Sequence, residues 1–311
     1  MSARMFRTPG RESIPRRSAT RIVGTAVALT ALSASLIVAG TGTASAAPKA
    51  VSGVKLIWGL SGEQGGGAFF GGCNFLSAGT AGNTGSSRLW TQADGFYQTT
   101  SGSVAVQKPN ANGKYIAPTW DTKCQDKNGV AVNPGSVTSL TGNRVVFSNA
   151  TGTVDVAAGT AKVQWNGSFT SVFYGGLTYW SAKNPKLAVA NGTGTLTALV
   201  SGYGADMDNS SQWTAIPERR ITIATLSGVN VTTTGITVTP DYLGKAVTTP
   251  AGATAQTAPT TTNADWWGAF PQQFVDFQQL TGQSSYWFSS GGSRDKAKVA
   301  LPVTVSWKSV A

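Results

Sequence analysis

Residues 161–173 alternate between apolar and polar side chains, and this alternation is the starting point for predicting the fold. One parity carries Ala161, Val163, Trp165, Phe169 and Phe173, and the other carries Lys162, Gln164, Asn166, Ser168 and Thr170. Successive side chains of a β-strand point to opposite faces of its sheet, so the pattern predicts a long strand with a buried face and a solvent face. Gly167 falls on the apolar parity, where it predicts a bulge or a bend.

Tyr174 follows this alternation on the polar parity, directly before Gly175 and Gly176. A tyrosine on the solvent side of a strand, beside a flexible turn, can cover a groove or meet a ligand. The alternative is that Tyr174 only caps the end of the sheet, because single exposed aromatic side chains are common on protein surfaces.

Short alternating segments recur along the rest of the chain, with turn residues at a spacing of roughly ten residues. They predict strands at 54–58, within 89–106, at 177–180, 186–189 and 193–200, in pieces of 221–238, and at 286–288 and 303–307, and a hairpin-like pair at 143–147 and 153–156. The glycine-rich residues 59–85 predict an ordered surface loop, and the polar residues 110–139 predict a second long loop. This arrangement is typical of all-β sandwiches and barrels.

One helix is predicted, at residues 271–280. The proline that begins this segment suits the first helical position, and Gly282 suits the end of a helix. Phe270, Phe274 and Phe277 share one face, which must pack against a partner. We expect that partner to be the β-sandwich itself.

The first 46 residues carry six arginines, then a small and apolar stretch at 22–40, and then the tripeptide Ala44-Ser45-Ala46. This order predicts a secretory signal peptide at 1–46. The pair Arg16-Arg17 leaves the twin-arginine route open, although we expect the ordinary secretory route. No second hydrophobic run has membrane-spanning length. We therefore expect a secreted, extracellular protein, or one held loosely at the cell wall, with no membrane span after cleavage.

Composition divides the remaining residues into three parts. Residues 47–247 hold the predicted sandwich domain. Residues 248–264 are rich in Thr, Ala and Pro and predict a flexible segment. Residues 265–311 hold the predicted helix and terminal strands, which we expect to pack on the sandwich.

The charge of the chain argues against nucleic acid as a partner. The full sequence has 24 basic and 13 acidic residues, and removal of six arginines and one glutamate with the signal peptide leaves a net charge of +6. These charges are scattered and form no stripe of lysine and arginine, which a nucleic-acid-binding surface requires.

The chain has two cysteines, Cys73 and Cys124. In an oxidising compartment such a pair predicts one structural disulfide. The alternative is a catalytic or metal-binding thiol, and we favour the disulfide.

The chain contains no histidine. This absence excludes Ser-His-Asp and Cys-His mechanisms, and it excludes the commonest protein ligand of zinc, copper and haem iron. Metal chemistry would have to use tyrosine, methionine or carboxylate. No pair of acidic residues suggests glycoside hydrolysis, so we do not expect an enzyme.

Two further groups of residues allow a functional and a structural interpretation. Asp206-Met207-Asp208-Asn209 could supply oxygen ligands to calcium, but such sequences are usually turns. The pairs Trp266-Trp267 and Tyr286-Trp287 could form a sugar-stacking platform, but such pairs more often fill a core or cover a helix.

Several short motifs resemble HtaA domains, which belong to secreted and surface haem-uptake proteins of actinobacteria. They are Trp58-Gly59, Gly167-Ser168-Phe169, Asn184-Pro185 and the GTGTL run at 192–196. The resemblance is best over residues 154–242.

This resemblance implies an immunoglobulin-like antiparallel β-sandwich with long loops, and haem bound at a groove by a tyrosine that a nearby histidine supports. The sequence departs from the family at both positions. Tyr174 stands where the family has its histidine, and Phe69 and Phe70 stand near the position of its first tyrosine. The usual pairing of tyrosine and histidine is therefore absent.

We expect Tyr174 to bind ferric haem iron as a phenolate, as tyrosine does in some haem proteins. Arg144 and Lys183 are candidate helpers for the phenolate or the haem propionates, and Tyr179 is a second candidate ligand. The resemblance thus implies a non-enzymatic haem-binding protein that exchanges haem with other surface proteins. The alternative is a cell-wall-binding, polysaccharide-binding or adhesion module that keeps the fold without haem.

Overall fold

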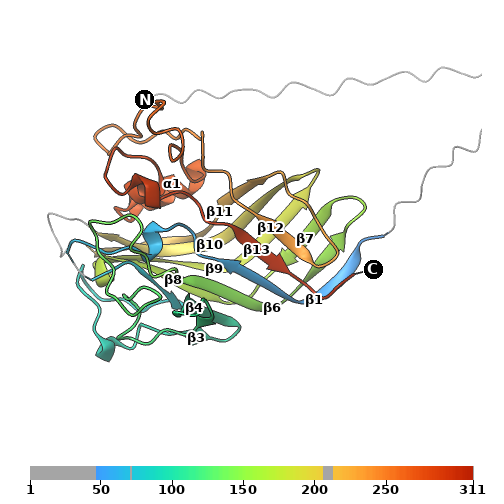
Figure 1. The fold of residues 1–311 in the computed structure, drawn as a ribbon, viewed down its shortest axis with the longest axis horizontal. Coiled ribbons are helices and arrows are strands. Elements are labelled where there is room, and N and C mark those ends of the chain that lie inside the picture. Colours follow the sequence, from blue (N-terminus) through green and yellow to red (C-terminus); the bar gives the residue numbers. More distant parts are fainter. Residues whose placement is uncertain (1–46, 71, 206–212, 311) are drawn as a thin grey trace, which may run out of the picture. The chain divides into compact units, whose positions relative to one another are not determined.

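The computed structural model describes residues 47–70, 72–205 and 213–310. Within these ranges, thirteen strands form one antiparallel sheet (Figure 1), and one α-helix follows near the C-terminus. The strands are β1 (Lys49–Trp58), β2 (Phe75–Ala78), β3 (Thr100–Ser101), β4 (Val104–Pro109), β5 (Tyr115–Ile116), β6 (Arg144–Asp155), β7 (Thr160–Gln164), β8 (Ser168–Phe173), β9 (Thr178–Ala190), β10 (Thr193–Ala205), β11 (Trp213–Ser227), β12 (Gly235–Val238) and β13 (Val303–Ser306). The helix is α1 (Gln272–Leu280), and short 3₁₀ turns are η1 (Glu63–Gly65), η2 (Gln92–Asp94), η3 (Tyr174–Gly176), η4 (Ser284–Trp287) and η5 (Asp295–Ala297).

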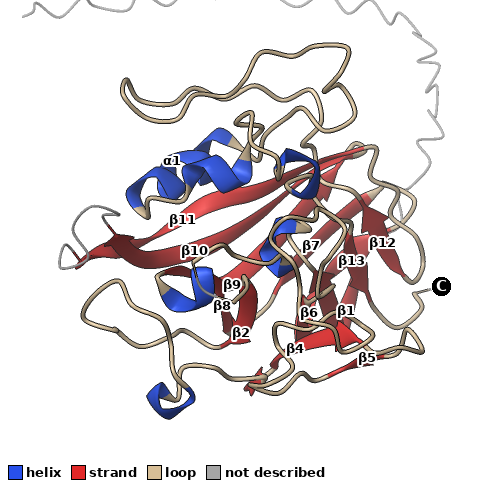
Figure 2. Ribbon diagram, turned by 60° about the vertical axis from the view of Figure 1, so that its left-hand side comes forward, coloured by secondary structure: helices blue, strands red, loops and turns tan. Residues whose placement is uncertain are grey.

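The sheet splits into two layers because β6 and β9 each change partner along their length. The main order is β11-β10-β9-β7-β6-β1-β13-β12. One end of β6 pairs with β7 and the other with β4, while one end of β9 pairs with β7 and the other with β8. Across the gap between the two branches, the rings of Phe147 in β6 and Phe169 in β8 lie 6.2 Å apart. The prediction of an all-β antiparallel sandwich is therefore confirmed (Figure 2).

A bend at Gly167 divides the long strand predicted from residue 161 onward into β7 and β8. Gly167 has a φ of 110°, and a Cβ atom there would lie 2.6 Å from Val104 Cγ2, so this position requires glycine. Lys162 and Gln164 of β7 face solvent as predicted. The solvent face predicted for β8 is wrong, since its Thr170 is fully buried.

A second, smaller core covers the outer face of β8 and explains this difference. Its members are Cys73, Phe75, Trp90, Val132, Val172 and Tyr179. They come from β2, β8, β9 and the loops near residues 90 and 132, and sequence periodicity gives no sign that such distant segments form a second layer.

The glycine-rich segment is not a surface loop throughout, contrary to its prediction. Its η1 turn is buried, and the chain then enters strand β2. The side-chain amide of Gln64 donates to Phe75 O at 3.0 Å, and that of Asn74 donates to Glu63 O at 2.9 Å. These two hydrogen bonds tie the buried turn to the start of β2.

Two other strand predictions are wrong for a common reason. Residues 143–147 and 153–156 are not a hairpin, because the residues between them continue as β6 and pair with β1. Residues 286–288 do not form a strand, and Tyr286 belongs to the 3₁₀ turn η4. In both places the neighbouring elements decide the local conformation.

The predicted helix is confirmed as α1. Pro271 is its N-cap residue, and Gly282 follows its end with a φ of 74°. Phe274 and Phe277 are buried, with ring centroids 5.2 Å and 6.0 Å from that of Trp180 in β9. Figure 2 shows α1 lying along β11, so its apolar face packs on the layer that contains β9, β10 and β11.

Residues 248–264 contain neither helix nor strand. Hydrogen bonds attach this segment to its surroundings: Gln256 Nε2 donates to Gly268 O at 3.0 Å, and Thr257 N donates to Ser289 O at 2.9 Å. The flexibility of the segment stays a prediction.

In the part of the chain that the structure describes, no helix is both long and apolar enough to cross a membrane.

The predicted disulfide between Cys73 and Cys124 is confirmed, with a Cα–Cα distance of 5.5 Å. Cys73 is fully buried in the second core, two residues before the start of β2. The bond therefore holds the long loop at 110–139 against the glycine-rich segment.

We expect the double substitution Cys73→Ser, Cys124→Ser to lower the free energy of unfolding by about 2–4 kcal/mol, because the unfolded chain regains the freedom that the crosslink removes. Urea unfolding measures this change. Dithiothreitol should lower the stability of the unmodified protein by a similar amount and leave the double variant unchanged. Equal sensitivity of both proteins to dithiothreitol would contradict the prediction.

A buried ion pair joins the C-terminal residues to the glycine-rich segment. Arg294 Nη2 lies 2.8 Å from Glu63 Oε2, and both side chains are nearly inaccessible to solvent. Arg294 also donates to the carbonyl oxygens of Pro134 and Ser136. One guanidinium therefore connects three distant segments of the chain.

We expect Arg294→Met to cost about 3–5 kcal/mol of folding free energy, because it leaves the Glu63 carboxylate buried without a partner. The double substitution Glu63→Gln, Arg294→Met should recover part of that loss, since no unpaired charge remains. Thermal and urea unfolding of the four proteins in this cycle measure both effects. A double variant no more stable than Arg294→Met would refute the assignment.

Candidate functional site

Tyr174 occupies a sharp backbone turn at the end of β8. Its φ is 51°, a left-handed conformation that is uncommon for a residue with a side chain. Tyr174 N donates to Asn74 Oδ1 at 3.0 Å, and Gly175 N donates to Cys73 O at 3.1 Å. Strand β2 and the disulfide therefore fix the turn that aims this phenol. Non-glycine residues in this conformation concentrate at functional sites, where surrounding contacts enforce them.

Three aromatic side chains gather at this turn: Phe70, Tyr174 and Tyr286. Together with Phe69, the exposed neighbour of Phe70 in the chain, we call them the aromatic patch. The hydroxyl of Tyr286 donates a hydrogen bond to the hydroxyl oxygen of Tyr174. The ring centroid of Tyr174 lies 5.8 Å from that of Tyr286 and 6.4 Å from that of Phe70. The two phenols thus meet at their oxygen atoms, beside an aromatic ring on each side.

The aromatic patch is open to solvent on one side. Phe69 and Phe70 are 65% and 74% exposed, which is high for such large apolar side chains. Tyr174 and Tyr286 are half-buried and pack against the main core, where Phe173 lies 4.5 Å from the Tyr286 ring. Small-molecule sites combine apolar and aromatic side chains with a few polar groups, and the patch offers both kinds of group.

The surroundings keep the phenol of Tyr174 neutral. Burial raises its pKa, and the nearby carboxylate of Glu63 raises that pKa further. Burial also raises the pKa of Glu63, while Arg294 opposes that rise. The Tyr174 hydroxyl is therefore neutral in the free protein, and its oxygen accepts a hydrogen bond. A bound metal cation would have to favour loss of the proton from this hydroxyl.

Tyr179, the second candidate ligand from the sequence, lies in the second core. It is 1% exposed, its hydroxyl donates to Gly82 O at 2.7 Å, and the same hydroxyl accepts from Thr84 N at 3.0 Å. A buried hydroxyl with these partners is not available to an outside ligand.

Arg144 and Lys183, the candidate helpers, are not brought to Tyr174. Lys183 pairs with Ser168 at the far end of the β8–β9 ladder, and its ammonium lies 3.6 Å from Glu218 Oε2. Arg144 stacks on the ring of Tyr115, with its guanidinium carbon 3.3 Å from the ring centroid. The sequence named both side chains as candidate helpers, but it could not show which part of the surface they occupy.

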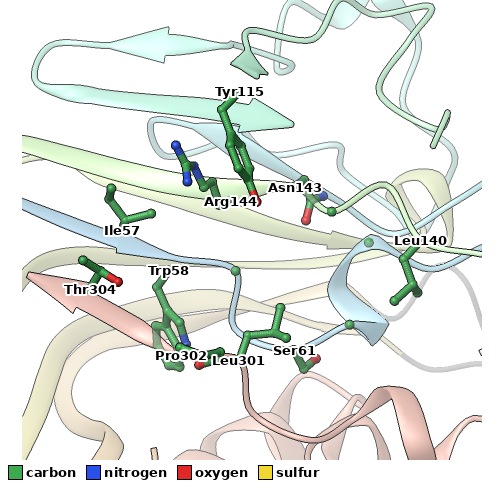
Figure 3. Close-up of a pocket in the computed structure, with 14 residues that line it drawn as sticks. Ile57, Trp58, Ser61, Tyr115, Leu140, Asn143, Arg144, Leu301, Pro302 and Thr304 are labelled. Carbon is green, nitrogen blue, oxygen red and sulfur yellow. The ribbon is translucent and has the colours of Figure 1, made fainter. Parts of the chain in front are cut away.

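Arg144 instead lines a separate cavity of about 380 Å³, which we call the Arg144 groove. Figure 3 shows Arg144 and Tyr115 on one side of this groove and Trp58, Leu301 and Pro302 on the opposite side. No member of the aromatic patch lines it. Burial lowers the pKa of Arg144, and Tyr115 partly offsets that effect, but a guanidinium stays charged at neutral pH.

The four rings considered as a sugar platform do not share one surface. Trp287 is fully buried and packs 4.7 Å from Phe274, while Trp266 lies under the ammonium of Lys296 at 4.4 Å. Trp267 donates through Nε1 to Thr257 O. The structural interpretation therefore holds for Trp287.

The calcium candidates at 206–209 lie outside the described residues. Within the described ranges, no group of three or more acidic or cysteine side chains could hold a metal ion.

The contact between Tyr286 and Tyr174 could not be predicted from the sequence. The two residues are 112 positions apart, and they meet only because the C-terminal block, residues 265–310, packs at the end of β8. No local pattern signals such a contact, although Tyr286 attracted attention as part of an aromatic pair.

Residues 106–259 match the family model of HtaA, described as Htaa. This range includes most of the sandwich strands and the motifs at 167–169, 184–185 and 192–196, but it begins after Trp58-Gly59 and the aromatic residues at 69–70. No curated protein matches the chain.

A comparison with solved structures finds two matches of low identity. One is the C-terminal domain of HtaA from Corynebacterium glutamicum, with 14% identity, 84% of this chain and 98% of that chain covered, and a TM-score of 0.39. The other is a domain-swapped dimer of a variant of the same domain, with 17% identity, 50% and 70% covered, and a TM-score of 0.28. The family match and the strand motifs within it show that this chain belongs to the HtaA family, whose members are associated with haem binding.

Proposed function

We propose that this protein binds haem at the aromatic patch, with Tyr174 as the iron ligand. The hydrogen bond from the hydroxyl of Tyr286 to that of Tyr174 is the observation that carries this assignment. It supports Tyr286 as the hydrogen-bonding partner that a histidine supplies in related domains. A chain without histidine thereby keeps a supported tyrosine.

The residues of the patch fit haem in their chemistry. Phenol oxygen is a known axial ligand of ferric haem, and it needs no histidine. The exposed rings of Phe69 and Phe70 offer apolar surface that a flat macrocycle would cover. When bound, haem would supply a ferric centre that favours the deprotonated form of the ligating phenol.

Each side chain would have a distinct role. Tyr174 would hold the iron through its oxygen, and the left-handed turn would fix the direction of that oxygen. Tyr286 would orient the ligand by donating its hydroxyl proton toward it, as outer hydrogen bonds commonly do at metal sites. Phe69 and Phe70 would exclude water from the bound ligand.

A binding role without catalysis agrees with these groups. Burial and the nearby Glu63 carboxylate keep the phenol of Tyr174 neutral, and the described residues place no histidine or free thiol beside it. With its signal peptide, the protein would act outside the cell, where it would receive haem from, or pass it to, other surface proteins. Of the four rings that would support the alternative of polysaccharide binding, Trp287 is buried.

We expect Tyr174→Phe to abolish the absorption bands of phenolate-ligated ferric haem and to weaken haem binding by tenfold or more. Tyr286→Phe should keep the phenolate bands and weaken binding roughly tenfold to a hundredfold, as loss of an outer hydrogen bond does at other metal sites. Absorption titration with ferric haem measures both. Tyr115→Phe removes a phenol outside the patch and should change neither. Unchanged spectra and affinity in Tyr174→Phe would end the proposal.

The double substitution Phe69→Ser, Phe70→Ser should weaken haem binding about tenfold or more, because it removes apolar surface that the macrocycle would bury. The absorption spectrum at saturation should stay that of the unmodified protein, since Tyr174 remains. Leu243→Ser, another exposed apolar side chain, is the matched control. Unchanged haem affinity in the double variant would show that these rings do not cover the ligand.

A further inference from the structure

The Arg144 groove lies on the outer surface of the β6–β1–β13 layer. Its floor includes Ile57 of β1, Arg144 of β6 and Thr304 of β13, and Ile57 and Thr304 are paired in the sheet. Tyr115 forms one wall, and Leu301 belongs to the other (Figure 3). Its volume of about 380 Å³ lies within the range of small-molecule sites, roughly 300–1,000 Å³.

Arg144 brings a positive charge into this groove without a carboxylate partner. Its Nε and Nη2 atoms both donate to the amide oxygen of Gln107, at 3.1 Å and 2.9 Å. Among the described residues, no carboxylate oxygen lies within 4.0 Å of its nitrogen atoms. The ring of Tyr115 and the amide of Gln107 hold the guanidinium in place, but they do not neutralise it. A fixed guanidinium of this kind is suited to a carboxylate.

The rest of the groove is mostly apolar. Leu140, Leu301 and Pro302 supply aliphatic surface, and Trp58 also lines the groove although it is only 2% exposed. Ser61 also lines the groove; it is 2% exposed, and its hydroxyl has no hydrogen-bond partner in the structure. A buried hydroxyl without a partner is costly, and a polar group of a bound molecule is one way to satisfy it.

We propose that the Arg144 groove binds a small amphipathic carboxylate, with the carboxylate at the Arg144 guanidinium and a flat apolar body between Tyr115 and the Trp58 side. The unpaired charge selects an anion. The apolar walls select a molecule with a hydrophobic body, and the unpartnered hydroxyl of Ser61 offers a second polar contact. This site takes a ligand different from haem, and it does not rest on the function proposed for the aromatic patch.

2-Naphthoate is a suitable probe, and 2-naphthamide is its neutral counterpart of the same shape. Titration of the full-length mature protein should shift the backbone amide signals of Gly59, Ser61, Gly62 and Arg144 in a saturable way. Because a hydrogen-bonded charge pair is lost, 2-naphthamide should bind roughly tenfold to a hundredfold more weakly. Absence of saturable shifts at these residues, or equal affinity for the two probes, would overturn the inference.

Two variants test whether the charge of Arg144 itself determines the affinity for 2-naphthoate. Arg144→Gln should lower the affinity for 2-naphthoate to that for 2-naphthamide, while Arg220→Gln, an exposed arginine outside the groove, should leave it unchanged. The wild-type comparison of the two probes stands even if Arg144→Gln does not fold. Unchanged 2-naphthoate affinity in a folded Arg144→Gln variant would refute the assignment.

Haem distinguishes this site from the aromatic patch. Tyr174→Phe should leave 2-naphthoate binding unchanged, and an excess of ferric haem should not displace the probe. Displacement by haem would mean that the groove belongs to the haem site, and the inference of a separate site would fail. If the protein failed to bind haem but still bound 2-naphthoate, the inference of a separate site would stand.

Discussion

The candidate haem site depends on the burial of strand β8 on both faces. Its inner face packs in the sandwich core through residues such as Phe169, and its outer face is covered by the second core around Phe75 and Trp90. A strand held on both sides cannot rotate or slip without exposing apolar side chains. The chain that leaves β8 therefore starts from a fixed position, and the left-handed turn at Tyr174 is fixed with it.

The C-terminal block completes this arrangement from the other side. Phe274 and Trp287 pack against Trp180, which anchors the block to β9. The Glu63–Arg294 ion pair joins it to the glycine-rich segment that carries Phe69 and Phe70. As a result, the patch is assembled from three parts of the chain that are each attached to a buried core. This explains how a chain without histidine can still offer a supported phenol.

The two candidate sites show how one scaffold can present different chemistry on different surfaces. The aromatic patch has two hydrogen-bonded hydroxyl groups beside exposed rings, which suits a flat ligand with a Lewis-acidic metal. The Arg144 groove has a fixed cation beside apolar walls, which suits an organic anion. The fold alone predicts neither, because the chemistry of a site comes from its particular side chains.

The sequence by itself determined the all-β class, the helix near the C-terminus with its buried phenylalanine face, the disulfide, the bend at Gly167 and the family. These features are encoded by local periodicity, by residues with special backbone freedom, or by an unambiguous count of cysteines. Only the tertiary structure decided that β8 is covered on both faces, that Tyr179 is buried, that Arg144 faces a groove of its own, and that Tyr286 meets Tyr174. Each of these depends on contacts between segments far apart in the chain. Periodicity gives the side of a strand to which a residue points, but it cannot identify what another segment places there.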